Sequence, residues 1–174
     1  MAIIRAIQGK TPQIGPETFL AETAVIIGDV VLGSQCSVWY HAVVRGDVHY
    51  IRVGDRTNIQ DGAILHCTYQ KAPLEIGSEV TIGHRAVVHG CRIGNRVLIG
   101  MGAIILDQAE IPDEVFIAAG ALIPPGARLE SGYLYAGIPA RAVRPLTPEE
   151  RADLRGYAHR YIYYKSWYEA ASVT

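Results

Sequence analysis

The strongest constraint in this sequence is a repeat of six residues. An aliphatic residue recurs at this step from Ile14 onwards, with interruptions near Arg45 and after His66, and with one step of five before Ile93. The residue four positions after each aliphatic is small or β-branched nearly throughout. A period of six matches neither the 3.6 of a helix nor the two of an alternating strand. The aliphatic positions are Ile14, Leu20, Ile26, Leu32, Val38, Val44, Val53, Ile59, Leu65, Ile76, Ile82, Val88, Ile93, Ile99, Ile105, Ile111, Ile117, Ile123 and Leu129.

This period fits a coil of short parallel strands, with three strands in each turn and one aliphatic and one small residue from each strand facing inwards. A β-sandwich is the alternative, but it requires alternating patterns and turn signals every 8–12 residues. The pattern resembles the hexapeptide-repeat family over about residues 14–140. That resemblance implies a left-handed parallel β-helix, although crossover connections are usually right-handed. We therefore predict a mainly β fold.

A helix is predicted after the repeat. Thr147 is a suitable N-cap, Pro148 suits the first helical position, and two glutamates follow in the first turn, near the positive end of the helix dipole. An apolar stripe at spacings of three and four predicts packing against the outside of the coil, and one of its tyrosines could reach a site instead. The chain is thus expected to contain a β-helix with its exit segment at 1–145 and a C-terminal helix at 146–174. The stripe consists of Leu154, Tyr157, Tyr161, Tyr164 and Tyr168.

Composition excludes several classes of partner. The chain has 174 residues and a formal net charge of -1, without the basic excess that nucleic acids or anionic membranes attract. Its longest uncharged apolar stretch, 115–127, contains two prolines and is too short to span a bilayer. The three cysteines have no CxxC spacing, which argues against disulfides and a cysteine-based zinc site. We expect a cytoplasmic protein that binds neither nucleic acid nor membranes.

Three of the six histidines cluster within 24 residues. If the stretch after His66 is a loop at one corner, His66 and His89 each follow an aliphatic residue by one position on the same face. They then point outwards from adjacent coils, about 4.8 Å apart. Arg45 falls one coil below His66 on this face. His84 lies on the neighbouring face, stacked over Asp61, so a corner separates it from the other two histidines.

A second subunit can bring these groups together. Packing one edge of the β-helix against another around a three-fold axis gives a closed trimer. His84 of one subunit then approaches His66 and His89 of its neighbour, and Asp61 approaches Arg45 as an interfacial ion pair. Three imidazoles without a fourth protein ligand leave the open position typical of catalytic zinc, although Fe2+ or Co2+ also suit a histidine-only site. We interpret His41 and His49 as surface residues.

Several segments together resemble γ-class carbonic anhydrases: 45–47 (RGD), 57–62 (TNIQDG), and the HxxxxH of His84 and His89, with His66 five residues after Asp61. The resemblance implies a metal-bound hydroxide that attacks CO2 to give bicarbonate. The three histidines become the metal ligands, with His84 from the adjacent subunit.

The resemblance also implies roles for five polar residues. Gln60 would hydrogen-bond the metal-bound water, and Asn58 would lie near the bicarbonate path, although a buried polar ladder explains Asn58 equally well. Arg45, Asp47 and Asp61 would form the interfacial charge network. For Asp47, a turn position is the simpler alternative.

The chain departs from the family pattern at the proton shuttle. The loop 67–73 contains no carboxylate, and Val48 follows Asp47 where an acid is expected. CO2 hydration requires proton loss from the metal-bound water in each turnover, so the sequence predicts weak activity. A metal-assisted acyl-CoA thioesterase or a CoA-dependent acyltransferase is one alternative function. A catalytically inactive assembly subunit is another.

Overall fold

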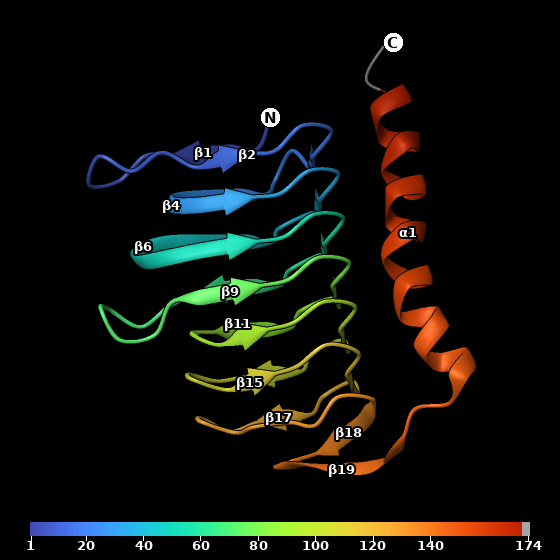
Figure 1. The fold of residues 1–174 in the computed structure, drawn as a ribbon. Coiled ribbons are helices and arrows are strands. Elements are labelled where there is room, and N and C mark those ends of the chain that lie inside the picture. Colours follow the sequence, from blue (N-terminus) through green and yellow to red (C-terminus); the bar gives the residue numbers. More distant parts are fainter. Residues whose placement is uncertain (172–174) are drawn as a thin grey trace.

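The computed structural model describes residues 1–171 and has one main feature, a stack of coils of short parallel strands (Figure 1). A single helix, α1 (Pro148–Ala171), runs along the stack. The predicted mainly β fold with a C-terminal helix is confirmed. Residues 172–174 of the predicted helix lie outside the described residues.

The strands form two sheets, of eleven and eight strands. All pairings within them are parallel except that of β18 with β19, which excludes the β-sandwich. The eleven strands of the first sheet are β1 (Ile3–Arg5), β2 (Gln13–Ile14), β4 (Val25–Leu32), β6 (Val43–Val53), β8 (Ile64–His66), β9 (Leu74–Ile76), β11 (Val87–His89), β12 (Arg92–Ile93), β14 (Ile104–Ile105), β15 (Glu110–Ile111) and β17 (Leu122–Ile123). The eight strands of the second sheet are β3 (Phe19–Leu20), β5 (Ser37–Val38), β7 (Asn58–Ile59), β10 (Thr81–Ile82), β13 (Leu98–Ile99), β16 (Phe116–Ile117), β18 (Tyr133–Gly137) and β19 (Ala140–Pro145).

The six-residue repeat sets the register of the stack. Leu65 pairs with Val88 and Val88 with Ile105 on one face, while Ile59 pairs with Ile82 on another. The repeat aliphatics of the central coils are at most 5% exposed. Burying this apolar surface in a continuous column is the main source of stability for such a coil. The predicted assignment of strands to three faces is therefore confirmed.

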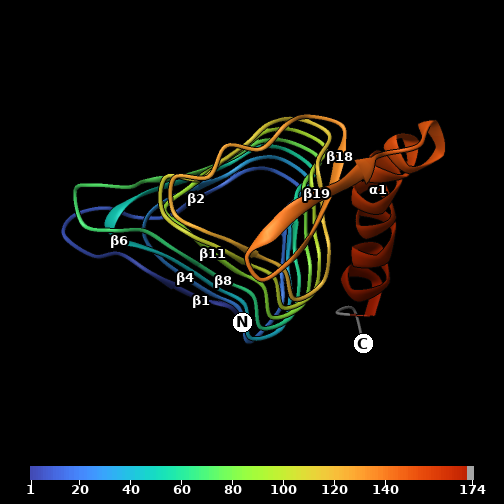
Figure 2. The same ribbon diagram turned by 90° about the horizontal axis from the view of Figure 1, so that it is seen from below.

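One corner of the triangular coil extends away from the stack (Figure 2). The long strands β4 and β6 run across this corner with a register shift, which joins two faces into one sheet. The loop 67–73 also leaves the coil here, closed by a bridge between Thr68 and Ala72. This extended corner places Asp47 and the loop beside the face that bears His66.

Helix α1 covers the face formed by the second sheet (Figure 2). Thr147 and Glu150 form a reciprocal capping box, with Glu150 N to Thr147 Oγ1 at 3.2 Å and Thr147 N to Glu150 Oε2 at 2.9 Å. Leu154 is buried, as predicted, whereas Tyr157 and Tyr168 remain 37% and 39% exposed. The predicted stripe is thus only partly covered, because α1 also packs through Ala158 and Lys165, both buried.

A column of corner residues attaches α1 to the coil. These residues adopt left-handed φ values of 52–59°. From the second member onwards, the backbone N–H of each donates to the carbonyl of the residue just before the preceding member. Glu79, only 8% exposed, accepts from Arg56 within the column and lies 3.1 Å from His159 Nε2 of α1. The column comprises Glu17, Gln35, Arg56, Glu79, Arg96 and Glu114.

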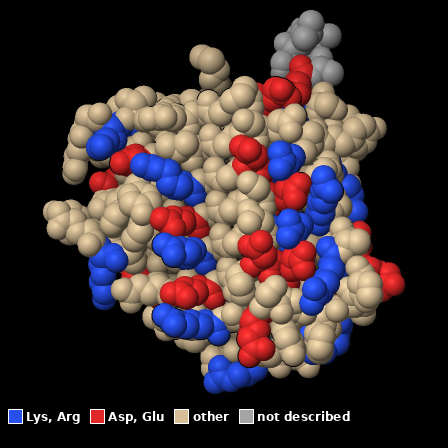
Figure 3. All heavy atoms as spheres, in the orientation of Figure 1, with Lys and Arg blue, Asp and Glu red and all other residues tan. Residues whose placement is uncertain are grey.

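Opposite charges also alternate down the outer surface of β6, β9, β12 and β15. Arg52 pairs with Asp29, Arg92 with Glu75, and Arg128 with Glu110. Acidic and basic side chains accordingly lie close together across the face drawn in Figure 3. This pairing accounts for a surface that is rich in charge on a chain with a net charge near zero.

Among the described residues, no helix is long and apolar enough to cross a membrane. The three cysteines, Cys36, Cys67 and Cys91, are all free and buried. Burial raises the pKa of the Cys36 thiol to about 11 and that of Cys67 to about 12. They therefore act as small apolar residues of the core.

The buried carboxylate of Glu79 is expected to make the free energy of unfolding depend on pH. Burial opposes ionisation, but hydrogen bonds from His159 and Arg56 outweigh it and lower the pKa of Glu79 below its ordinary 4.5. The ionised form therefore stabilises the fold above this value, and that contribution is lost as pH falls through the lower folded pKa. We expect Glu79→Gln to reduce the free energy of unfolding at pH 7 by about 1–3 kcal/mol and to flatten its decline in acid.

Urea unfolding between pH 3 and 7 measures this effect. Glu17→Gln is the matched control, because Glu17 lies in the same column but is exposed, with Gln35 as its partner. Equal pH profiles for the wild type and Glu79→Gln would contradict the assignment.

Candidate metal centre

Two histidines meet on the outer surface of adjacent coils. The parallel pairing of β8 with β11 places His66 directly beside His89, and His66 Nδ1 lies 3.1 Å from His89 Nε2. Val44 pairs with Leu65 in the neighbouring ladder, so Arg45 occupies the same column one coil away. The column predicted from the repeat is confirmed.

Asp47 holds the other side of the His66 ring. Its Oδ1 lies 3.0 Å from His66 Nε2, and its Oδ2 accepts a hydrogen bond from Arg45. Burial disfavours the charged carboxylate, but these two partners lower the pKa of Asp47 below its ordinary value. Burial also lowers the pKa of His66, against the opposing effect of Asp47. Asp47 lies within β6, so it is not the turn residue of the simpler alternative.

Asp107 contacts the ring of His89 as Asp47 contacts that of His66, and the sequence pattern did not predict this contact. Its Oδ1 lies 2.5 Å from His89 Nδ1, and its Oδ2 accepts from Thr68 Oγ1. Burial opposes ionisation, but hydrogen bonds from Thr68 and His89 lower the pKa of Asp107. The available signal was its position two residues after Ile105, in the coil that stacks on His89.

His84 lies at a different corner of the coil, as predicted. It stacks over Asp61, with Nδ1 2.9 Å from Asp61 Oδ2, and both side chains are 43% exposed. Within residues 1–171 of a single chain, no three His, Cys, Asp or Glu side chains are grouped closely enough to hold a metal ion. In the single chain, the His84 side chain is exposed to solvent and its side-chain partner among the described residues is Asp61.

Gln60 and Asn58 lie under α1, on the face formed by the second sheet. Gln60 Nε2 donates to Asn58 Oδ1 at 3.0 Å, and Asn58 Nδ2 donates to Thr81 Oγ1 at 2.9 Å. The three side chains form a buried polar ladder, which was the alternative interpretation of Asn58. Its effect is to fix the amide of Gln60.

A cavity of about 410 Å3 lies between this face and α1. Gln60 and His84 line it together with three tyrosines of α1, so these tyrosines do reach a candidate site: Tyr157, Tyr161 and Tyr164. Burial raises the pKa of Tyr161 to about 12, so its hydroxyl stays protonated.

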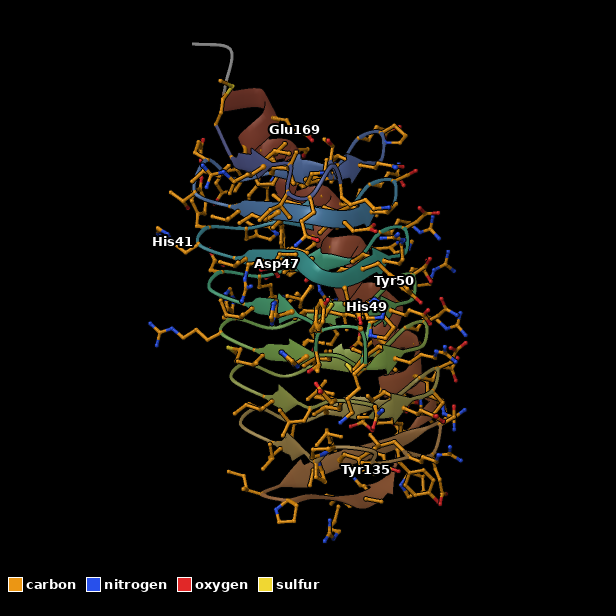
Figure 4. The ribbon with its side chains drawn as sticks, turned by 90° about the vertical axis from the view of Figure 1, so that its left-hand side faces the viewer. His41, Asp47, His49, Tyr50, Tyr135 and Glu169 are labelled. Atoms are coloured by element: carbon orange, nitrogen blue, oxygen red, sulfur yellow. The ribbon has the colours of Figure 1, made fainter. Side chains whose placement is uncertain are left out.

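The two remaining β-helix histidines differ from each other. His41 is exposed at a corner and points away from Asp47 (Figure 4), as expected for a surface residue. His49 is half-buried and packs edge-on against Tyr50, with ring centroids 4.9 Å apart. It lines a cavity of about 210 Å3 together with Asp47, so the prediction of a plain surface residue is only partly right.

The arrangement of His66 and His89 fits a metal ion. Each ring has one nitrogen on a carboxylate, and its other nitrogen faces the neighbouring ring. Two ligands of a tetrahedral zinc with Zn–N bonds of 2.0–2.1 Å lie about 3.3 Å apart, close to the observed 3.1 Å. Carboxylate-supported imidazoles are the usual surroundings of metal-ligating histidines.

These features define a parallel β-helix protein of six-residue repeats, and residues 90–125 match the family "Bacterial transferase hexapeptide (six repeats)". Protein YrdA of Escherichia coli is 48% identical over 172 residues, which cover 95% of this chain and 94% of YrdA. A carbonic anhydrase of Geobacillus kaustophilus is 42% identical, with 94% and 89% of the two chains covered. A crystal structure of a hexapeptide transferase family protein from Anaplasma phagocytophilum superposes with a TM-score of 0.92 at 40% identity, covering 95% and 98% of the chains.

The chain therefore belongs to the γ-class carbonic anhydrase family of hexapeptide-repeat proteins.

Proposed function

We propose that this protein is a γ-type carbonic anhydrase that converts CO2 to bicarbonate at metal sites shared between the subunits of a homotrimer. The observation that supports this best is the pair of facing nitrogens on His66 and His89, each ring held by a carboxylate. His84 of a neighbouring subunit would supply the third ligand. Zn2+ is the expected metal, with Fe2+ or Co2+ as alternatives.

The surface beside the histidine column supports the proposed trimer. Aliphatic side chains point outwards from successive coils one register position before the column, and Ile64 and Ile104 are each 38% exposed. A continuous apolar stripe on the outside of a sheet marks an interaction surface. A second copy of the chain is the proposed occupant, because His84 lies on a different corner and a closed ring joins unlike surfaces. The stripe consists of Val43, Ile64, Val87, Ile104 and Leu122.

A divalent metal at this site would act as a Lewis acid that lowers the pKa of water to about 7. The other contributions come from this chain's own side chains. Gln60, fixed by Asn58, would hydrogen-bond and orient the attacking water. Arg45 and Asp47 would hold the orientation of His66, and Asp61 would pair with Arg45 across the interface.

Removal of His89 tests the metal site. We expect one metal ion per wild-type subunit and at least a 100-fold loss of CO2 hydration in His89→Ala, because two imidazoles alone bind zinc poorly. Elemental analysis of anaerobically purified protein and stopped-flow hydration assays measure both. His41→Ala is the matched control, since His41 is exposed and distant from the column. A metal-free wild type would contradict the proposal.

A charge in the apolar stripe tests the shared site. We expect Ile104→Glu to convert the trimer to monomers and to weaken metal binding, because a buried unpaired carboxylate is costly and His84 would no longer be supplied in trans. Analytical ultracentrifugation with metal titration measures both effects. Ile138→Glu is the control, since Ile138 is 75% exposed and lies between β18 and β19, beyond the stripe. Full metal binding by a monomeric Ile104→Glu would exclude a site that depends on the trimer.

The loop 67–73 predicts slow proton removal. It contains no carboxylate, and both Asp47 and Asp107 are engaged by histidines. We therefore expect kcat to rise several-fold as imidazole buffer is increased from about 1 to 50 mM, because the buffer replaces the missing internal base. The measurement is kcat at constant pH and ionic strength. A kcat independent of buffer would show that proton transfer does not limit turnover.

An acyl-CoA thioesterase or acyltransferase is the second candidate function. The cavity of about 410 Å3 beside His84 and Gln60 is far larger than CO2 requires and is lined by apolar and aromatic side chains. A metal-loaded trimer that hydrolyses acyl-CoA but does not hydrate CO2 would favour this candidate. A trimer without either activity would favour an assembly subunit.

A further inference from the structure

Asp107 joins three segments that are far apart in the sequence. It lies in the turn between β14 and β15 and contacts His89 Nδ1 through Oδ1. Its second oxygen accepts from Thr68 Oγ1 at 2.5 Å, at the start of the loop that follows His66. Both carboxylate oxygens therefore have a partner, and neither partner is one of the arginines that pair with the other surface carboxylates.

Gly90 makes this approach possible. A Cβ atom at Gly90 would lie 2.6 Å from Asp107 Oδ1 and 2.8 Å from Ala72 Cβ, and the residue adopts φ +54°. Gln108 N also donates to Gly90 O at 2.6 Å, which fixes the turn after Asp107 against the end of β11. The backbone next to His89 is thus shaped to receive a side chain from the following coil.

The contact has a consequence for the imidazole. A carboxylate at Nδ1 favours the tautomer with the proton on that nitrogen, which leaves the lone pair on Nε2. Nε2 of His89 is the atom that faces His66 Nδ1 at 3.1 Å. Without Asp107, the ring could rotate about its side-chain bonds and share its proton between both nitrogens.

We infer that Asp107 is a positioning residue for His89 and that Thr68 acts through it, so the loop after one ligand orients the other. This inference rests on the proposed metal site. The loop 67–73, which lacks the carboxylate of a proton shuttle, would instead help to hold the ligand His89 in position. Asp107 is assigned a supporting role and not that of a ligand, because it contacts His89 Nδ1, whereas the other ring nitrogen, Nε2, faces His66.

Cobalt binding to the metal-free trimer tests this role. We expect Asp107→Ala to weaken Co2+ binding 10- to 100-fold and to alter the visible absorption spectrum of the bound ion, with partial recovery in Asp107→Asn, which retains an acceptor. Thr68→Val should weaken binding less. Because both residues act through one carboxylate, adding Thr68→Val to Asp107→Ala should cause no further loss. Wild-type affinity in Asp107→Ala, or additive losses, would overturn the inference.

Two further measurements separate this inference from the proposed function and from misfolding. Glu110→Gln is the matched control, since Glu110 is a carboxylate of the same coil that contacts Arg128 and no histidine. NMR of labelled histidine in the metal-free protein should show the proton of His89 on Nδ1 in the wild type and a mixed tautomer in Asp107→Ala. Failure of the wild type to bind cobalt would contradict the proposed function, whereas an unchanged His89 tautomer would contradict the role of Asp107.

Discussion

The structure depends on the register between successive coils. Parallel ladders place each residue beside one that lies 17 to 23 positions away, as for Glu75 with Arg92 and His66 with His89. The spacing between neighbouring strands is fixed at about 4.8 Å by backbone hydrogen bonds, so side chains in one column are neighbours whatever the sequence between them. The buried aliphatic residues maintain this register, because a shift by one residue would turn them outwards.

That constraint explains both what the candidate site contains and what a single chain lacks. The register aligns Arg45, His66 and His89 on one face, whereas it assigns His84 to a separate corner with Asp61. No side-chain rotation moves a residue between corners of a coil whose interior is fully packed. A site with all three histidines would consequently need a second copy of the chain, and the apolar stripe beside the column is the surface proposed to bind it.

The sequence predicted the coil, its three faces and the histidine column, because all follow from a period that can be counted. It did not predict Asp107, because this residue belongs to the coil after His89 and not to the loop 67–73, where the family pattern places an acid. The contact also depends on turn geometry and on the space left by Gly90, which no periodicity describes. Likewise, Asn58 lies buried in β7, a strand of the sheet that α1 covers (Figure 2), and the sequence does not specify where the helix docks.

The two carboxylates that flank the histidine pair fix the orientation of both imidazole rings. Asp47 contacts His66 and Asp107 contacts His89. Each carboxylate also has a cation near it, because Arg45 donates to Asp47 and the charge of Lys71 helps to lower the pKa of Asp107. Burial lowers the pKa of His66, so its ring is neutral and able to act as a ligand at neutral pH. Two carboxylates and two nearby cations leave this half-buried region without a net charge. The support for the proposed metal ion therefore comes from geometry and not from net charge: each carboxylate holds one nitrogen of an imidazole, so that the other nitrogen faces the neighbouring ring.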